Sequence, residues 1–281
     1  MNMTEKDLTK VETHFAFGQN WAEYSLKVGE AEIVEAELGL RKLLKDEEIA
    51  NKSFLDIGCG SGLHALAALR LGVRRVVALD IDKDSVVTTR QMLGRHAPPE
   101  AAESWCVEEK SVFDLLPGNK GRFDIVYSWG VLHHTGNLMH ALNCAAACVV
   151  PGGLFCFALY RRILMDWFWH IEKRWYVKTT PEAQTRARRC YIALYRLLLG
   201  RKNHESRVTN YRNRRGMDYY HDVHDWLGGW PYESISPDEV ERHMCALGFE
   251  PVRKFISKNR LHRCIGLFGS GCDEYVYRRQ H

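Results

Sequence analysis

The sequence predicts an α/β protein with a doubly wound, mostly parallel seven-stranded sheet and a helical insertion after the fifth strand. Three observations support this fold class. Short apolar runs alternate with helical patterns between residues 53 and 160, which is typical of a parallel sheet. A basic and aromatic stretch at 161–231 then interrupts the alternation. One further helical pattern and two further apolar runs follow it and complete the sheet.

Local patterns predict each element of the first two thirds of the chain. Apolar residues spaced three or four apart predict an N-terminal helical layer at 20–45. Pro151-Gly152-Gly153 predicts a turn before the fifth strand. The expected strands are 53–57, 75–80, 105–107, 123–128 and 154–160, and the expected helices between them are 63–71, 83–94 and 137–149.

The last third should contain the insertion and the closing elements of the sheet. Within 161–231 we expect helices at about 163–176 and 181–199. Ser236 is the expected N-cap of a helix that has Pro237 at its first position. That helix should end near Gly248, before strands at about 249–257 and 264–277. We therefore expect a single domain, divided into a helical layer (1–50), a core (51–160), a lid-like insertion (161–231) and a closing helix and strand pair (232–281).

Composition restricts the class of protein. The 281 residues contain no run of about twenty apolar residues, so we expect no transmembrane helix. The polar N-terminus does not resemble a signal peptide, which predicts a cytoplasmic protein. Nine cysteines occur without a Cys-x-x-Cys pair, and those in apolar segments, such as Cys106, Cys144, Cys148 and Cys156, are predicted to be buried free thiols.

Charge is unevenly distributed along the chain. The net charge is +4, yet residues 161–215 hold fifteen Lys or Arg against four Asp or Glu, a balance of +11, and the remainder carries −7. Such asymmetry indicates either an anionic partner for this region or a solvated basic surface.

A glycine turn follows the first predicted strand and indicates a cofactor site. Residues 54–62 read Phe-Leu-Asp-Ile-Gly-Cys-Gly-Ser-Gly, and Asp80 ends the next strand, where it can accept hydrogen bonds from ribose hydroxyls. The G-x-G-x-G spacing differs from the dinucleotide fingerprint, and Asp56 suits a cationic ligand better than a pyrophosphate. The competing interpretation is a glycine turn that only packs a helix on a strand.

This D-I-G-C-G-S-G segment with its downstream acid resembles motif I of class I S-adenosylmethionine-dependent methyltransferases. Residues 123–153 look like the segment after strand four in small-molecule methyltransferases related to ubiquinone and menaquinone biosynthesis. The resemblance implies S-adenosyl-L-methionine as cofactor, and Ser111 stands where relatives have an acid near adenine. The implied cofactor-binding residues are Asp56, Gly58, Cys59, Gly60, Gly62, Asp80, Ile81, Ser111, Val112, Ser128, Trp129 and Gly130.

Two regions are candidates for the acceptor side. His133 and His134 follow the strand-four loop and either deprotonate the acceptor or shape the loop. Residues 215–233 contain Tyr, His and Asp side chains and, with 15–21 and 271–277, resemble a bacterial subgroup whose acceptor these motifs do not reveal. This cluster is either a metal site, a substrate-positioning site with His221 or Asp222 as base, or purely structural. The expected substrate-binding residues are Phe17, Trp21, Tyr24, Tyr219, Tyr220, Asp225 and Trp226.

The insertion has a basic and aromatic face with three open interpretations. It contains Trp167-Phe168-Trp169, Trp175-Tyr176 and the arginines Arg186, Arg188 and Arg189. Such a face lies on an anionic membrane surface, binds a phosphate or nucleic-acid backbone, or covers the pocket as a lid.

Together these features predict methyl transfer to an oxygen or nitrogen of a small-molecule or lipid-linked acceptor, with an anionic acceptor left open and no metal required. One alternative is an RNA or protein methyltransferase. Against it, residues 128–131 read Ser-Trp-Gly-Val rather than a D/N-P-P-Y/F motif. The other alternative is a cofactor-binding pseudoenzyme or regulatory protein.

Overall fold

The computed structural model describes residues 15, 17–26, 28–115, 122–209, 211, 219–256 and 265–281. Some expectations fall elsewhere: Ala16, residues 215–218 of the Tyr/His/Asp cluster and the beginning of the strand expected at 264–277 lie outside the described residues.

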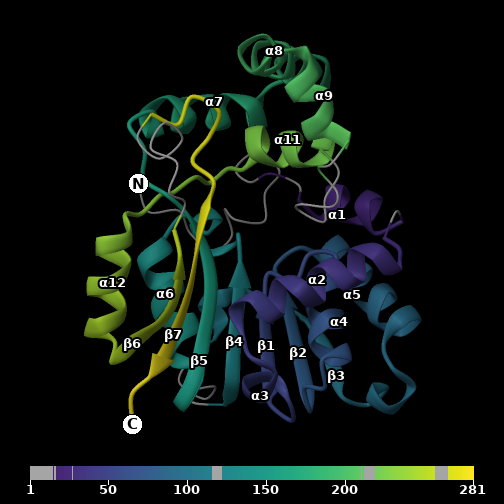
Figure 1. Cartoon of the computed structure of the whole chain (residues 1–281), viewed down its shortest axis with the longest axis vertical. Helices are drawn as coiled ribbons and strands as arrows, with labels where there is room; N and C mark the ends of the chain where they lie inside the picture. The colour runs from purple at the N-terminus through teal and green to yellow at the C-terminus, as the bar shows by residue number, and fades with distance from the viewer. Residues whose placement is uncertain are drawn as a thin grey trace.

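A seven-stranded sheet forms the centre of the molecule, as the sequence predicts (Figure 1). Its strand order is β3-β2-β1-β4-β5-β7-β6, and β7 runs antiparallel to both of its neighbours while the other pairs are parallel. The strands are β1 Ser53–Ile57, β2 Arg75–Asp80, β3 Trp105–Glu109, β4 Phe123–Trp129, β5 Val149–Tyr160, β6 Phe249–Phe255 and β7 Cys272–Arg279.

Helices cover both faces of this sheet (Figure 1). One face packs against α2 Glu30–Leu43, α4 Leu63–Arg70 and α5 Lys83–His96, and the other against α6 Leu138–Ala147 and α12 Pro237–Ala246. The alternation of strand side chains explains the two layers. In β1, Phe54 belongs to the first cluster and its neighbour Leu55 to the second.

A third, aromatic cluster lies beyond the carboxyl ends of the parallel strands. It includes side chains of α7 Asp166–Lys178, α8 Pro181–Leu199 and α11 Tyr219–Gly228. Helix α1 Phe17–Ser25 approaches the same end of the sheet (Figure 1). The remaining helices with printed bounds are α3 Asp46–Ile49, α9 Arg201–Thr209 and the 3-10 turns Pro99–Ala101, Val112–Asp114 and Leu132–His134. Among the described helices, none combines the length and apolarity of a membrane span.

Two boundary expectations are wrong. The strand expected at about 264–277 is β7, which begins only at Cys272, and the described residues 265–271 before it form a loop. Pro151-Gly152-Gly153 does not precede the fifth strand but lies inside β5, which begins at Val149. The β4–β5 register shifts there, from Phe123↔Val149 to Ile125↔Leu154, so the segment forms an irregularity within the strand. By contrast, Ser236 caps α12 as predicted, accepting a hydrogen bond from the Glu239 N–H at 3.3 Å.

A buried ion pair joins the end of β5 to the beginning of β7. The guanidinium of Arg161 donates to both carboxylate oxygens of Asp273, with Nε 2.7 Å from Oδ2, and both side chains are almost fully buried. Bidentate pairing of this kind offsets the cost of burying the two charges. It holds the end of the sheet where the insertion leaves the core.

Candidate active site

The glycine turn between β1 and α4 brings backbone amides to the edge of the sheet. The N–H groups of Gly58 and Cys59 both donate to the Leu79 carbonyl, at 2.8 and 3.0 Å. Gly58 has φ +76°, and a Cβ there would overlap the Val131 side chain. Only glycine allows this conformation and this close approach together.

Asp80 is fixed at the tip of β2 by the same turn. Its Oδ2 accepts from the Gly60 N–H at 2.9 Å, and its Oδ1 accepts from the Asp82 N–H at 3.0 Å. Each carboxylate oxygen keeps a further lone pair for a ligand. The arrangement therefore holds Asp80 in one orientation while leaving acceptor capacity toward the cavity.

Burial makes the two acids of this region hard to ionise. Desolvation, together with the nearby charge of Asp80, raises the pKa of Asp56 to about 7, and a backbone hydrogen bond from Ala65 opposes the shift. Desolvation also raises the pKa of Asp80 to about 6, although the N–H groups of Asp82 and Gly60 oppose the shift. A cationic ligand would favour the ionised form of both.

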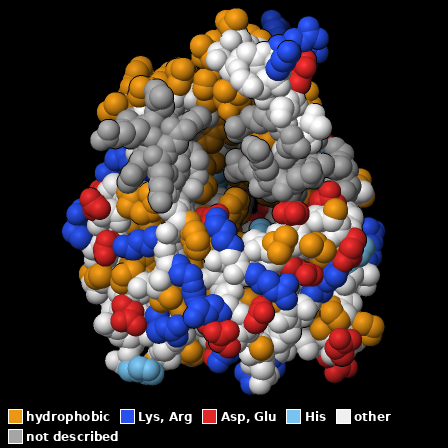
Figure 2. Space-filling view, viewed as in Figure 1, with side chains coloured by type: hydrophobic (Ala, Val, Ile, Leu, Met, Phe, Trp, Pro, Cys, Tyr) orange, Lys and Arg blue, Asp and Glu red, His pale blue; other side chains and the backbone are white. Residues whose placement is uncertain are grey.

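A cavity of about 920 Å³ adjoins the turn, and the molecule is visibly hollowed below α7, α8 and α11 (Figure 2). We call the part of the cavity next to the glycine turn the donor half; it is lined by 58–61, 80–82, 111–113 and 129–131. We call the remaining part the acceptor half; it is lined by side chains of α8 and α11, by the end of β5 and by residues 268–272. Pockets for organic ligands usually measure about 300–1,000 Å³.

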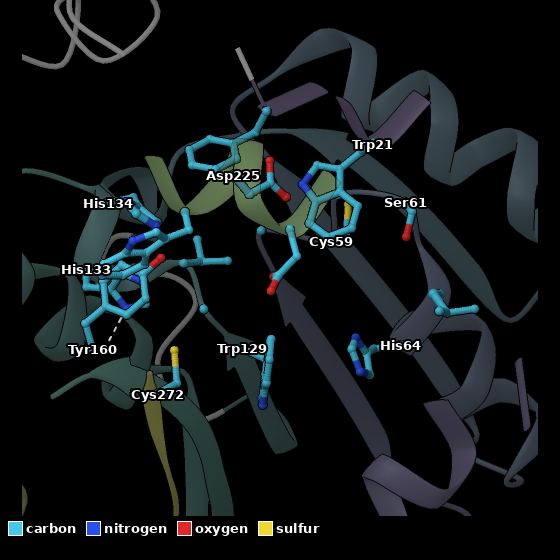
Figure 3. Close-up of a pocket in the computed structure, with 18 of the residues that line it drawn as sticks. Trp21, Cys59, Ser61, His64, Trp129, His133, His134, Tyr160, Asp225 and Cys272 are labelled. Carbon is cyan, nitrogen blue, oxygen red and sulfur yellow. Dashed lines mark hydrogen bonds between the residues drawn. The ribbon is translucent and has the colours of Figure 1, made fainter. Parts of the chain in front are cut away.

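Helix α1 closes the donor half. The Gly18 N–H donates to Asp82 Oδ2 at 3.2 Å, and a Cβ at Gly18 would overlap the Asp82 carboxylate. The Trp21 indole lies against Gly60, within 3.2–3.3 Å of where a Cβ would stand, and faces the cavity opposite Trp129 (Figure 3). Asp82 also caps α5, accepting from Asp84 N–H at 2.8 Å.

His133 and His134 have opposite neutral tautomers. The Tyr160 N–H donates to His133 Nδ1 at 3.3 Å, so the ring proton of neutral His133 is on Nε2 (Figure 3). His134 Nδ1 lies 2.7 Å from the Pro231 carbonyl, which can only accept, so the proton of His134 is on Nδ1 and Nε2 is the basic nitrogen. Burial lowers the pKa of His133 well below its ordinary value, and His134 and Lys173 add to this effect. His133 is therefore neutral.

The acceptor half is predominantly aromatic. The Tyr160 ring lies 3.8 Å from the His133 ring and 5.2 Å from the Trp226 ring, measured between centroids. From α8, the Tyr191 hydroxyl donates to the Phe268 carbonyl at 3.1 Å, which ties this helix to the loop before β7. From α11, Asp225 points into the cavity (Figure 3).

Most of the residues predicted from sequence line this single cavity. They are Gly58, Cys59, Gly60, Asp80, Ile81, Ser111, Val112, Trp129, Gly130, His133, His134, Phe17, Trp21, Tyr24, Tyr219, Asp222, Asp225 and Trp226. Asp222 Oδ2 accepts a hydrogen bond from the Tyr211 hydroxyl.

Five predicted residues are not in the cavity wall. Asp56 lies buried beneath the turn, Gly62 caps α4 with φ +78°, and Ser128 donates to the Ile57 carbonyl at 3.1 Å. Tyr220 is 56% exposed, and His221 Nε2 lies 3.7 Å from the Glu23 carboxylate. The last two point away because α11 turns its Tyr219, Asp222, Val223 and Trp226 face inward.

The structure adds residues that sequence reasoning missed. His64, the second residue of α4, lines the donor half, and burial lowers its pKa to about 4. Tyr160, Tyr191 and Tyr195 line the acceptor half, as does Cys272. The sequence signal for His64 was its position two residues after Gly62, the last glycine of the turn. None existed for Tyr191 and Tyr195, because their i, i+4 spacing is equally typical of a helix core.

No group of three or more His, Cys, Asp or Glu side chains suited to a metal ion occurs among the residues that the structure describes. Of the cysteines expected to be buried, Cys144, Cys148 and Cys156 are buried and free, whereas Cys106 is half-buried.

Comparison with known proteins finds a related family for the core of the chain. Residues 55–157 match the family model described as a methyltransferase domain. The match covers the sheet from β1 to β5, so this part of the chain is similar to a methyltransferase domain. Its strand order agrees with this assignment, since the glycine turn and Asp80 lie on neighbouring central strands, β1 and β2.

Related sequences match this chain over short segments. Ribosomal protein L11 methyltransferase of Psychrobacter arcticus is 36% identical over 70 residues, 25% of this chain and 23% of that protein. The Thermotoga maritima protein of the same name is 37% identical over 89 residues, 32% of this chain and 29% of that protein. The chain thus spans roughly a quarter of the length of these relatives.

Solved structures share the fold at low identity. Magnesium protoporphyrin IX methyltransferase from Synechocystis PCC 6803, with bound SAH, has a TM-score of 0.52 at 12% identity, covering 89% of this chain and 84% of that chain. An S-adenosylmethionine-dependent methyltransferase from Mesorhizobium loti has a TM-score of 0.52 at 17% identity, covering 87% and 98%. The [4+2]-cyclase SpnF has a TM-score of 0.53 at 11% identity, covering 88% and 80%.

Proposed function

We propose that this methyltransferase transfers a methyl group from S-adenosylmethionine to an oxygen or nitrogen of a small organic acceptor. The observation that carries the proposal is that one continuous cavity contains both the donor half and the acceptor half. Its donor half presents the glycine turn and Asp80, and its acceptor half continues directly from it. A volume of about 920 Å³ has room for a cofactor and a small acceptor together.

The residues of the donor half fit the cofactor. Asp80 has lone pairs for ribose hydroxyls, the Gly60 backbone allows close approach beside Trp21, and ionised Asp56 would favour positive charge above the turn. When bound, the cofactor supplies an electrophilic methyl group on a sulfonium. The residues of the chain would then need chiefly to position the acceptor atom toward that methyl group and to exclude water.

We assign the proton-accepting role to His134 rather than His133. In the neutral tautomers set by Pro231 and Tyr160, His134 has its basic nitrogen at Nε2, whereas His133 has a proton there. His133 Nε2–H is therefore a hydrogen-bond donor, and it has no partner among the described residues. His221 lies outside the cavity wall and takes no part in this scheme.

The acceptor half favours a small aromatic or apolar molecule over a macromolecule. Tyr160, Tyr191, Tyr195 and Trp226 supply flat surfaces suited to stacking. The Lys and Arg side chains in the described wall of the whole cavity are Lys42, Lys110 and Arg161. They already pair with Glu274, Glu108 and Asp273, respectively, so an anionic acceptor gains no support. The short relatives named for ribosomal protein L11 leave most of their length unmatched, so they do not argue for a protein acceptor here.

A screen of acceptors tests the proposal. Purified protein is incubated with S-adenosylmethionine and a panel of phenols, catechols, hydroxyquinones and aromatic amines, and release of S-adenosylhomocysteine is measured. We expect turnover with a member of this panel. His134→Gln should then lower kcat by about 10²–10⁴-fold if proton transfer limits the rate, while His133→Gln should act mainly on KM. Turnover confined to proteins or RNA would contradict the proposal.

A further inference from the structure

Helix α7 carries apolar side chains on two faces. Trp169 and Tyr176 point inward and are buried in the aromatic cluster. A second apolar series with helical spacing faces outward. Its members are Leu164, just before the helix, Trp167, Phe168, Ile171 and Trp175, of which Trp167 is 66% and Ile171 62% exposed. Packing of the fold accounts for the inner face and not for the outer one.

The C-terminal half of α8 repeats this arrangement. Tyr191 and Tyr195 face the cavity, whereas Leu194, Leu197 and Leu198 face outward, with Leu197 78% exposed. We call the outward residues of α7 and α8, together with Leu164, the apolar face. Figure 2 shows hydrophobic side chains gathered along the top of the molecule, over the helices that Figure 1 labels α7 and α8. Exposed groups of this size usually mark an interaction surface.

The exposed charged side chains of these helices are mostly positive. The exposed, described basic side chains of α7, α8 and α9 are Arg174, Lys178, Arg186, Arg189, Arg196, Arg201 and Lys202. The exposed acidic side chains of the same helices are Glu182 and Glu205, and Glu205 Oε1 pairs with Arg201 Nε at 2.9 Å. Large apolar side chains beside an excess of Lys and Arg are what an anionic lipid surface binds.

We propose that α7 and α8 dock on an anionic phospholipid bilayer, with the apolar face in the interface and the basic side chains among the headgroups. Because α8 lines the acceptor half through Tyr191 and Tyr195, docking brings the pocket next to the membrane. Resting on the function proposed above, this placement gives the acceptor class as a lipophilic molecule that reaches the enzyme from the bilayer.

The charge pattern argues against two other occupants. A second copy of the chain would place the same basic surface opposite itself, and like charges facing each other oppose association. A nucleic acid would use the arginines but would leave Leu194, Leu197, Leu198 and Ile171 without apolar partners. An anionic bilayer satisfies both the charges and the apolar side chains.

Vesicle sedimentation tests the proposal with the full chain. The protein is mixed with vesicles of phosphatidylcholine alone, and with vesicles in which part of the phosphatidylcholine is replaced by phosphatidylglycerol. We expect binding to the second kind, weakened by salt. Two variants probe the two components: Trp167→Ser with Ile171→Ser, and Arg186→Glu with Arg189→Glu. Each should weaken vesicle affinity at least about ten-fold, from lost apolar burial in the first and reversed charge in the second.

Matched variants on the opposite part of the molecule serve as controls. Val87→Ser removes an exposed apolar side chain of α5, and Arg74→Glu with Arg95→Glu reverses two exposed charges. Both should bind vesicles like the unaltered protein. Circular dichroism checks that every variant is folded, and since all the substituted side chains are exposed, the fold should be retained.

The outcomes separate docking from catalysis. Absence of binding to phosphatidylglycerol vesicles, or equal loss in the control variants, overturns the docking proposal. The proposal is also overturned if the Trp167/Ile171 variant binds vesicles normally but has lost either salt-sensitive binding of RNA or the formation of dimers. Turnover of a water-soluble acceptor without vesicles tests the proposed function alone, because the docking variants leave the cavity wall intact.

Discussion

Cofactor affinity should rise steeply with pH, because the two buried acids must ionise to bind it. Burial raises the pKa of Asp80 to about 6 and that of Asp56 to about 7. Ribose hydroxyls and positive charge both favour the ionised carboxylates. Binding therefore lowers these pKa values, releases protons and becomes tighter as pH rises.

The size of the change in cofactor affinity follows from the fraction of each carboxyl group that is ionised at a given pH. If S-adenosylmethionine binds only ionised Asp80, its affinity at about pH 5 is roughly ten-fold below that at pH 8. If Asp56 must ionise too, the loss reaches about a thousand-fold, since at pH 5 only about one molecule in a hundred has that group ionised. Calorimetric titrations in buffers of different ionisation enthalpy measure both the affinity and the protons released.

Asp80→Asn supplies the control. Like a protonated carboxyl group, asparagine keeps one carbonyl oxygen, which accepts from either the Gly60 or the Asp82 N–H, while its NH2 group cannot accept from the other. The contribution of Asp80 to the pH dependence disappears. The same variant should be more stable than the unaltered protein at pH 8 and equal to it below about pH 4. Because the pKa of Asp80 is higher in the folded than in the unfolded protein, ionisation of this carboxyl destabilises the fold. The unaltered protein should lose up to about 3 kcal/mol of unfolding free energy as the pH rises from the unfolded pKa of Asp80 through its folded pKa of about 6. Constant affinity from pH 5 to 8, or proton uptake on binding, would refute this reasoning.

Two further predictions concern the scaffold. Gly58→Ala should destabilise the protein by more than the roughly 1 kcal/mol expected of Gly72→Ala and weaken cofactor binding, because both residues have positive φ but only at Gly58 would the methyl group overlap Val131. Thermal melts and calorimetry compare the pair, and equal melting temperatures would contradict the steric argument. Asp273→Asn should cost about 3–5 kcal/mol by leaving a buried guanidinium without its counter-ion, against at most about 1 kcal/mol for Asp46→Asn in an exposed pair. Urea unfolding measures this contrast, and similar losses would count against it.

Local sequence patterns were sufficient to predict the strands of the sheet and the residues of the donor half. The glycine turn, Asp80 and the Ser236 cap each combine a residue type with a backbone requirement that few alternatives satisfy. The error at Pro151-Gly152-Gly153 arose because a Pro-Gly-Gly segment is compatible with a turn and with an irregularity inside a strand. The pairing of β4 with β5 decides between them, and it joins residues far apart in sequence.

The acceptor half was harder to predict because helix orientation decides which side chains face inward. Tyr219 and Tyr220 are adjacent and chemically identical, yet one lines the cavity and the other is exposed. Likewise, the tautomers of His133 and His134 follow from their partners, the Tyr160 N–H and the Pro231 carbonyl respectively, which no sequence motif encodes. Contacts between distant segments, rather than residue types, define this part of the site.

The most direct test of the central claim is calorimetric titration of S-adenosylmethionine into the unaltered protein and into Asp80→Ala. We predict one site per chain, with affinity weakened about ten- to a hundred-fold in the variant through loss of charge-assisted hydrogen bonds to the ribose. Absence of binding to the unaltered protein, or equal affinity in Asp80→Ala, would contradict the assignment of this cavity to the methyl donor.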